Sequence, residues 1–184
     1  MKKLIYIGIL LGCNLTYAQV AIGKANVDGE SAILDFESST TNTLGLILPT
    51  VTSSANVLDT QDLGNNITRT LQNGTFIYDK ADAKVKMREA GIWKDLSPVA
   101  GNSTGTIENL SDDIGHGTVI GEDEAGTTSA SGVLVIESTQ KAMILPLINQ
   151  PEINVQGPYP GMICYDTSSK TLAVFDGTKW NYWK

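Results

Sequence analysis

Two aspartates come nearest to an acid–base pair in this chain. Asp79 and Asp166 each follow a tyrosine at the end of a short apolar run. Glycoside hydrolysis uses two carboxyl groups that face the bond to be cleaved. The same local context occurs twice, however, and an aspartate after a strand commonly accepts hydrogen bonds from the backbone of its own turn. We therefore predict a turn-forming role for both residues.

Few other residues could perform catalysis or bind a metal. The single histidine, His116, lies between glycines and has neither an acid nor a nucleophile in motif spacing. The acidic runs at 112–113 and 122–124 could collect Ca²⁺, but they lack the alternating aspartates and the glycine of a calcium-binding loop. We predict no catalytic residue, no metal site and no cofactor, and therefore that the protein is not an enzyme.

Charge and cysteine content exclude further classes of protein. The 184 residues include 20 acidic and 13 basic side chains, and the net charge of -7 would repel a nucleic-acid backbone. Two cysteines and one histidine cannot supply a zinc site or a disulfide framework. Cys164, flanked by Ile163 and Tyr165, is predicted to be a small buried side chain in a strand rather than a reactive thiol.

The aromatic residues near the C-terminus are the best candidates for contact with a partner. Side chains alternate along a strand, so Trp180 and Tyr182 would share one face while Trp183 takes the other. Planar aromatics both stack on sugars and anchor protein interfaces, which leaves a glycan or a protein as the partner. Trp180 recurs as Trp93 and is more simply a core residue, whereas Trp183 has Leu96 as its counterpart and is freer to bind.

The segments that must position these residues occur twice along the chain, as an internal repeat. Similar segments recur in the same order, with offsets that change only between segments: Leu34–Ser38 with Leu134–Ser138 (offset 100), Ile47–Pro49 with Ile144–Pro146 (97), Gly74–Asp79 with Gly161–Asp166 (87), and Trp93 with Trp180 (87). Loops absorb the differences in length because they carry little packing. We predict a first repeat over residues 19–97, a Gly/Ser/Thr-rich linker over 98–117, and a second repeat over 118–184.

Each repeat is predicted to consist of short strands. The strand candidates are short, apolar and rich in β-branched residues: 32–37, 44–49, 75–78, 85–88 and 92–96 in the first repeat, and 132–137, 143–146, 162–165, 172–175 and 179–183 in the second. Pro49 and Pro146 mark the ends of strands because proline cannot donate to a ladder. The fold class is therefore all-β, with two tandem repeats that end in β-meanders. Leu63, Ile67 and Leu71 recur at every fourth position and predict one short helix in the first repeat.

The N-terminus has the layout of a secretory signal peptide. Lys2 and Lys3 precede an apolar run that ends at Cys13, and Ala18 precedes the expected cut, which makes residues 1–18 the signal. The apolar run is too short to span a bilayer. In a second interpretation Cys13 is the acylated residue of a lipoprotein. We expect a protein without a transmembrane span that is exported to the periplasm, the cell surface or the exterior.

The repeated segments resemble a module of secreted Bacteroidota-type proteins that is similar to pieces of phage tail fibres. The resemblance runs through short segments of both halves: Gln19–Gly23, Ala32–Asp35, Gly45–Pro49, Gly74–Asp79 and Trp93, then Ile144–Pro146, Gly161–Asp166 and Phe175–Trp180. The resemblance covers most of residues 19–184, although Ala21 stands where such modules usually have glycine. It implies an extracytoplasmic fibre, surface or adhesin-like component, often oligomeric, with no catalytic residues to carry over.

From these observations we predict an exported, non-catalytic structural or adhesin-like surface module. It would act through self-association or by docking to a larger envelope or fibre assembly. The alternative is a carbohydrate-binding accessory protein that uses the aromatic side chains of Trp180, Tyr182 and Trp183.

Overall fold

The structure of the protein is a computed structural model. The structure describes residues 19–29, 31–57, 60–62, 67–69, 71–106, 118–121 and 132–184. Most regular structure in these residues is β-strand, with one 3-10 turn, η1 (Ser54–Asn56), and one short helix, α2 (Pro151–Asn154). The predicted all-β fold class is confirmed.

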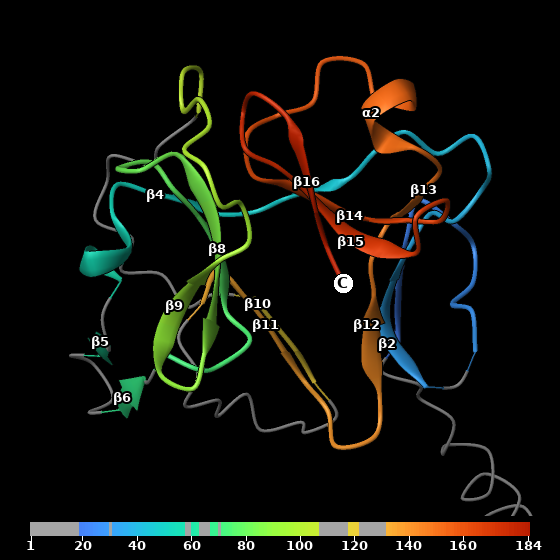
Figure 1. The fold of residues 1–184 in the computed structure, drawn as a ribbon. Helices are drawn as coiled ribbons and strands as arrows, with labels where there is room; N and C mark the ends of the chain where they lie inside the picture. Colours follow the sequence, from blue (N-terminus) through green and yellow to red (C-terminus); the bar gives the residue numbers. More distant parts are fainter. Residues whose placement is uncertain are drawn as a thin grey trace, which may run out of the picture.

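Two antiparallel meanders form the upper part of the molecule and lie side by side (Figure 1). The first lobe is the four-stranded sheet of β4 (Thr50–Val51), β7 (Phe76–Asp79), β8 (Lys84–Glu89) and β9 (Ile92–Asp95). The second lobe is the sheet of β13 (Leu147–Ile148), β14 (Met162–Asp166), β15 (Thr171–Phe175) and β16 (Trp180–Trp183), to which β3 (Leu46–Ile47) is added. The predicted meander strands are therefore present in both halves.

The two lobes have the same strand pairing. In each, a short strand after a proline runs parallel to the first strand of the meander: Thr50 lies opposite Tyr78, and Leu147 lies opposite Tyr165. These pairs correspond at the offsets of 97 and 87 that relate the sequence segments. The two antiparallel pairings that follow, β7–β8–β9 and β14–β15–β16, also correspond residue for residue at the offset of 87.

Pro49 and Pro146 stand where the chain changes sheets. Pro49 lies between β3, which belongs to the second lobe, and β4, which belongs to the first. Each proline carbonyl accepts a hydrogen bond from a meander tyrosine, Tyr78 or Tyr165, with a donor–acceptor distance of 2.9 Å. A proline cannot donate to a ladder but can accept from one, so these residues end one pairing and begin the next.

One hydrophobic core joins the two lobes. Its buried members come from both halves: Leu48, Tyr78, Ala83, Val85, Leu96, Ile163 and Val174. The hydroxyl of the fully buried Tyr78 donates to the carbonyl of Asp176 in the second lobe, at 3.1 Å. A Cβ on Gly161 would lie only 2.9 Å from the Cβ of Tyr78, so glycine is needed for this close approach.

Three further sheets complete the described structure. β1 (Val20–Ile22), β2 (Ala32–Phe36) and β12 (Ala142–Ile144) form a parallel sheet, β10 (Thr118–Gly121) and β11 (Leu134–Glu137) form a parallel pair, and β5 (Thr60–Asp62) and β6 (Ile67–Arg69) form an antiparallel pair. The first strands of the two halves again correspond, because Val20 lies opposite Leu34 as Thr118 lies opposite Leu134.

The helix predicted from Leu63, Ile67 and Leu71 is wrong. The described parts of this segment are the paired strands β5 and β6, which include Ile67, and the helical turn η1 lies before them. The four-residue recurrence of apolar residues competed with β-branched residues such as Thr60 and Thr68, which favour strands, and with the intervening Gly-Asn-Asn, which favours a turn.

Several predictions from the sequence concern residues outside those described. They are the signal peptide or lipoprotein cysteine in residues 1–18, His116, and the acidic runs at 112–113 and 122–124. Within the described residues, neither helical segment is long and apolar enough to cross a membrane.

Candidate association surface

The Asp79 side chain, at the end of β7, forms hydrogen bonds with neighbouring segments. One carboxylate oxygen accepts a hydrogen bond from the backbone N–H of Ala81 (3.0 Å), and the other accepts from the backbone N–H of Ser54 (2.9 Å) and the ammonium of Lys86 (2.8 Å). Lys86 also pairs with Asp82 at 2.6 Å. Burial opposes ionisation of Asp79, but these hydrogen bonds hold its pKa below the ordinary value.

Asp166 has the equivalent place in the second lobe. Its carboxylate accepts backbone hydrogen bonds from Ser168 (2.9 Å), Ser169 (3.0 Å) and Gln150 (3.0 Å). Burial again opposes ionisation, yet these donors and the Ser169 hydroxyl keep the pKa of Asp166 below the ordinary value. The predicted turn-forming role of Asp79 and Asp166 is confirmed, and the two carboxylates belong to different sheets.

Cys164 lies fully buried in β14, as predicted from its apolar neighbours. It is a free cysteine, and burial raises the pKa of its thiol to about 12. The thiol is therefore protonated at neutral pH and packs as a small apolar group. Among the described residues, no three His, Cys, Asp or Glu side chains are grouped in a way that could hold a metal ion.

The three C-terminal aromatics have different environments. The ring of Trp180 packs against Phe175 with 5.5 Å between centroids and joins a second apolar cluster on the outer face of the second lobe. Tyr182 and Trp183 are 41% and 43% exposed. The hydroxyl of Tyr182 donates to the carboxylate of Glu152 in α2, and burial together with this carboxylate raises the pKa of Tyr182.

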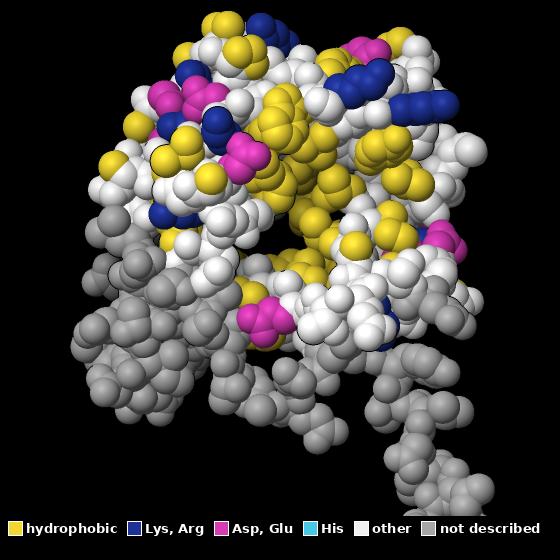
Figure 2. Space-filling view, turned by 60° about the horizontal axis from the view of Figure 1, so that its bottom comes forward, with side chains coloured by type: hydrophobic (Ala, Val, Ile, Leu, Met, Phe, Trp, Pro, Cys, Tyr) yellow, Lys and Arg dark blue, Asp and Glu magenta, His cyan; other side chains and the backbone are white. Residues whose placement is uncertain are grey.

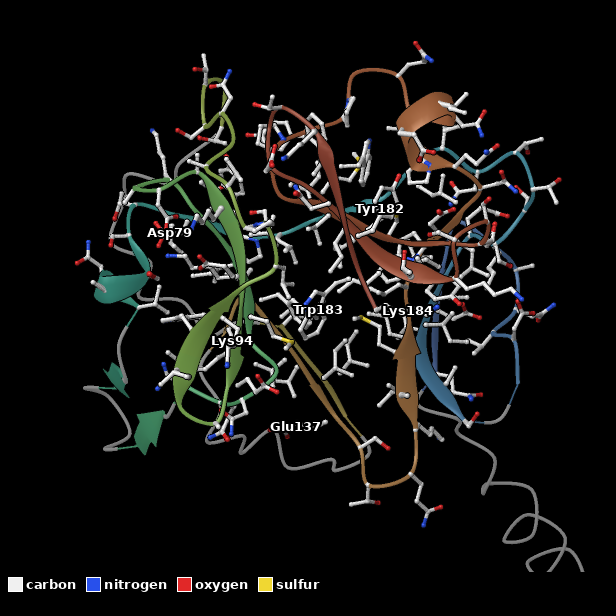
Figure 3. All side chains as sticks on the ribbon, in the orientation of Figure 1. Asp79, Lys94, Glu137, Tyr182, Trp183 and Lys184 are labelled. Carbon is white, nitrogen blue, oxygen red and sulfur yellow. The ribbon has the colours of Figure 1, made fainter. Side chains whose placement is uncertain are left out.

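Tyr182 and Trp183 do not form one flat platform. The pairing of β16 with β15 is regular, so the two neighbouring side chains lie on opposite faces of the sheet. Trp183 lies opposite Leu172, which packs against the core between the lobes, whereas Tyr182 lies opposite Ala173 of the outer cluster. In Figure 3, Trp183 occupies the space between the lobes.

The core between the lobes is open on one side. Figure 2 shows hydrophobic side chains gathered in a hollow between the two lobes. Several hydrophobic residues that pack against the core are only partly buried: Leu46, Phe76, Met87, Leu145 and Leu172. An exposed apolar surface of this kind is typical of an association site.

Exposed apolar residues also occur on two short strands that the sequence analysis did not single out as sites. Ile47 of β3 is 50% exposed, and Leu134 of β11 is 40% exposed, next to Val133 at 62%. The sequence could have pointed to these residues, because alignment of the two halves pairs each of them with an apolar residue of the other repeat. Their exposure becomes evident only when the partners of each strand are known.

The second half of the chain is similar to a known protein family. Residues 119–184 match the family described as the phage tail like trimerisation region. No curated protein and no solved structure matches the chain. The matched segment begins in β10 and contains the whole second lobe. It supports the resemblance to a tail-fibre-like module, and a module of that kind is structural and self-associating.

Proposed function

We propose that the protein is an exported, non-catalytic structural component whose chains associate in threes within a larger fibre or surface assembly. The match of residues 119–184 to a phage tail like trimerisation region carries this proposal. The basic N-terminus followed by an apolar run supports export, with processing after Ala18. The assembly belongs to a cell envelope of the Bacteroidota type, in keeping with the recurring segments of the sequence.

The distribution of apolar residues supports association as the mode of action. The chain is acidic overall, but its exposed hydrophobic side chains include Ile47, Leu134 and Trp183 on three different strands. Short strand edges with exposed apolar residues are a liability for a monomer, because other chains can pair with them. In a trimer the same edges and the hollow between the lobes become buried interface.

The mass of the protein in solution tests this proposal. Light scattering and sedimentation equilibrium on the full chain, purified as its cell processes it, should give three times the mass of one chain. A mass of one chain over the whole concentration range would contradict the proposal. Mass spectrometry of the N-terminus of the same sample would test export, with Gln19 expected as the first residue.

A pair of variants in β16 tests the hollow. Trp183→Ala removes an aromatic side chain that lies between the lobes and should weaken trimer formation by about tenfold or more, since aromatic residues dominate interface energies. Tyr182→Ala is the matched control, because Tyr182 is equally exposed but lies on the opposite face. Equal effects of the two variants would contradict a role for the hollow.

Carbohydrate binding is the second candidate for the exposed aromatics. The separation of Tyr182 and Trp183 onto opposite faces gives it less support than self-association, because a sugar ring stacks on one continuous surface. A glycan array probed with the full chain tests it. Binding that is lost in Trp183→Ala while the trimer persists would favour this second candidate.

A further inference from the structure

In the two halves of the chain, one strand of each half pairs with a strand of the other half. β3, from the first half, pairs antiparallel with β14 of the second lobe, with Leu46 opposite Ile163. β12, from the second half, pairs parallel with β2 of the first half, with Met143 opposite Leu34. β3 and β12 are counterparts at the offset of 97, so equivalent segments of the two halves make both of these pairings.

The β3–β14 pairing is antiparallel and the β12–β2 pairing is parallel, and the equivalent edge in the other half is in each case not covered by a described strand. β12 lies along β2, but no described strand lies along the equivalent edge of β11. β3 lies along Met162 and Ile163, but no described strand lies along the equivalent residues of the first lobe, Thr75 and Phe76. A relation that leaves one unfilled edge at each end is heterologous, and repeated application of it forms a ring or a filament.

Burial distinguishes the filled edge from the unfilled one. In the first half, Ile33 and Leu34 are both 0% exposed, with β12 alongside β2. Their counterparts at the offset of 100, Val133 and Leu134, are 62% and 40% exposed. The residues are apolar in both halves. The strand of the second half therefore has the composition of a buried strand, but no described strand lies alongside it as β12 lies alongside β2.

We infer that β3 of a second copy of this chain lies along the edge of β11 that no described strand covers. The pairing of β12 with β2 sets the register, which places Leu46 of one copy opposite Leu134 of the other, and Ile47 opposite Val135. In the same contact, β12 of the first copy lies along Thr75 and Phe76 of the second. This inference rests on the proposed self-association and assigns the strands that carry it.

A second copy is the occupant because the chain already contains both partners of the pairing. Strand addition depends on backbone hydrogen bonds, and the side chains of the added strand set its specificity. The added segment must have the chemistry of β12, and β3 is its counterpart, with Ile47 half exposed. Closure after three copies gives a ring of six repeats and agrees with the match to a trimerisation region.

Cysteine cross-linking tests the assigned register. One chain carries Ile47→Cys and another carries Val135→Cys, and the two are mixed, dissociated, reassociated and oxidised. The native Cys164 is fully buried and does not compete. Disulfide-linked dimers should form between the two kinds of chain, since paired strands bring the Cβ atoms within bonding range. The double variant should give linked trimers.

A matched control tests the register rather than mere proximity. Glu137→Cys lies on the same strand and the same face as Val135→Cys, roughly 7 Å further along. Its yield of cross-link with Ile47→Cys should be at least tenfold lower. Ile22→Cys, an exposed position in β1 on the far side of β2, should give none.

The outcomes separate this inference from the proposed function. A trimer by light scattering with no cross-link between positions 47 and 135, or with equal cross-linking at 137, would overturn the strand assignment and leave the trimer intact. A chain that stays monomeric would overturn both. Cross-linked chains at the predicted register, with the mass of a trimer, support both.

Discussion

The two lobes have the same strand pairing but different side chains on their outer faces. In the first lobe, Lys86 reaches Asp79 on the outer face. The counterpart of Lys86 at the offset of 87 is Ala173, which is fully buried in an apolar cluster with Ile148, Cys164 and Phe175. One lobe therefore has an ion pair where the other has a small apolar side chain.

The same contrast extends to the next pair of strands. The guanidinium of Arg88 lies 5.7 Å from the ring centroid of Trp93, and their counterparts, Phe175 and Trp180, form an aromatic pair. Both lobes nevertheless keep the aspartate that ends the first meander strand and accepts backbone hydrogen bonds. Residues that bind the backbone therefore set the same strand pairing in both lobes, while the side chains of the outer faces differ.

The largest effect is expected when the first lobe's chemistry is transferred to the second. Ala173→Lys places an ammonium among fully buried apolar side chains, and we expect a loss of about 4 kcal/mol in the free energy of unfolding. Thr178→Lys adds the same charge at an exposed position and is the control. Urea unfolding followed by tryptophan fluorescence measures both. A loss below about 1 kcal/mol for Ala173→Lys would show that Asp166 can accept a lysine as Asp79 does.

Two counterpart truncations should differ in size. Phe175→Ala removes a side chain that is 9% exposed from an apolar cluster and should cost about 3 kcal/mol. Arg88→Ala removes a cation–aromatic contact, which should cost about 0.5–1 kcal/mol. The same unfolding experiment compares them. Equal losses would mean that the polar outer face of the first lobe is as tightly packed as the apolar one.

Acid should reduce the contribution of both aspartates. Because the pKa values of Asp79 and Asp166 are lower in the folded chain, their contribution is present above the unfolded pKa of about 4 and is lost as pH falls through the folded value. Asp79→Asn and Asp166→Asn should each cost about 1–2 kcal/mol at pH 7. The deficit should shrink towards pH 3 in urea unfolding. A deficit that does not change with pH would contradict the assigned pKa directions.

The smallest effect is expected at the exposed ends of the meanders. Tyr182→Phe removes the hydrogen bond to Glu152 and should cost about 0.5 kcal/mol. Its counterpart Asp95 pairs with Lys84 at 2.6 Å, and Asp95→Asn should have an equally small effect because exposed ion pairs contribute little. Thermal unfolding of the two variants checks this. A loss above about 2 kcal/mol in either would show that the strand end is cooperatively tied to the core.

Local patterns in the sequence were sufficient to predict the meanders. Apolar runs rich in β-branched residues predicted the strands, and Pro49 and Pro146 predicted where strands end, because proline lacks a backbone donor. The recurring Asp79 and Asp166 predicted the turns. Each of these features acts within a few residues, so a single sequence is enough to recognise it.

The pairing between halves could not be predicted in the same way. Nothing local to β3 indicates that it pairs with β14 rather than with its own half, since a two-residue strand carries little register information. The helix α2 was also missed, although Pro151 at its first position and Glu152 in its first turn are typical of a helix start. Four residues are too few to establish a helical period.

The exchange of β3 and β12 also affects how the chain is made. A ribosome releases Leu46 long before its partner Ile163, which lies 117 residues further along the chain. The first lobe shares its core with Ile163 and Val174, so it cannot finish folding before these residues have been synthesised. Pairing over such long separations is slow, so the first half stays incompletely folded until its partner strands have been made.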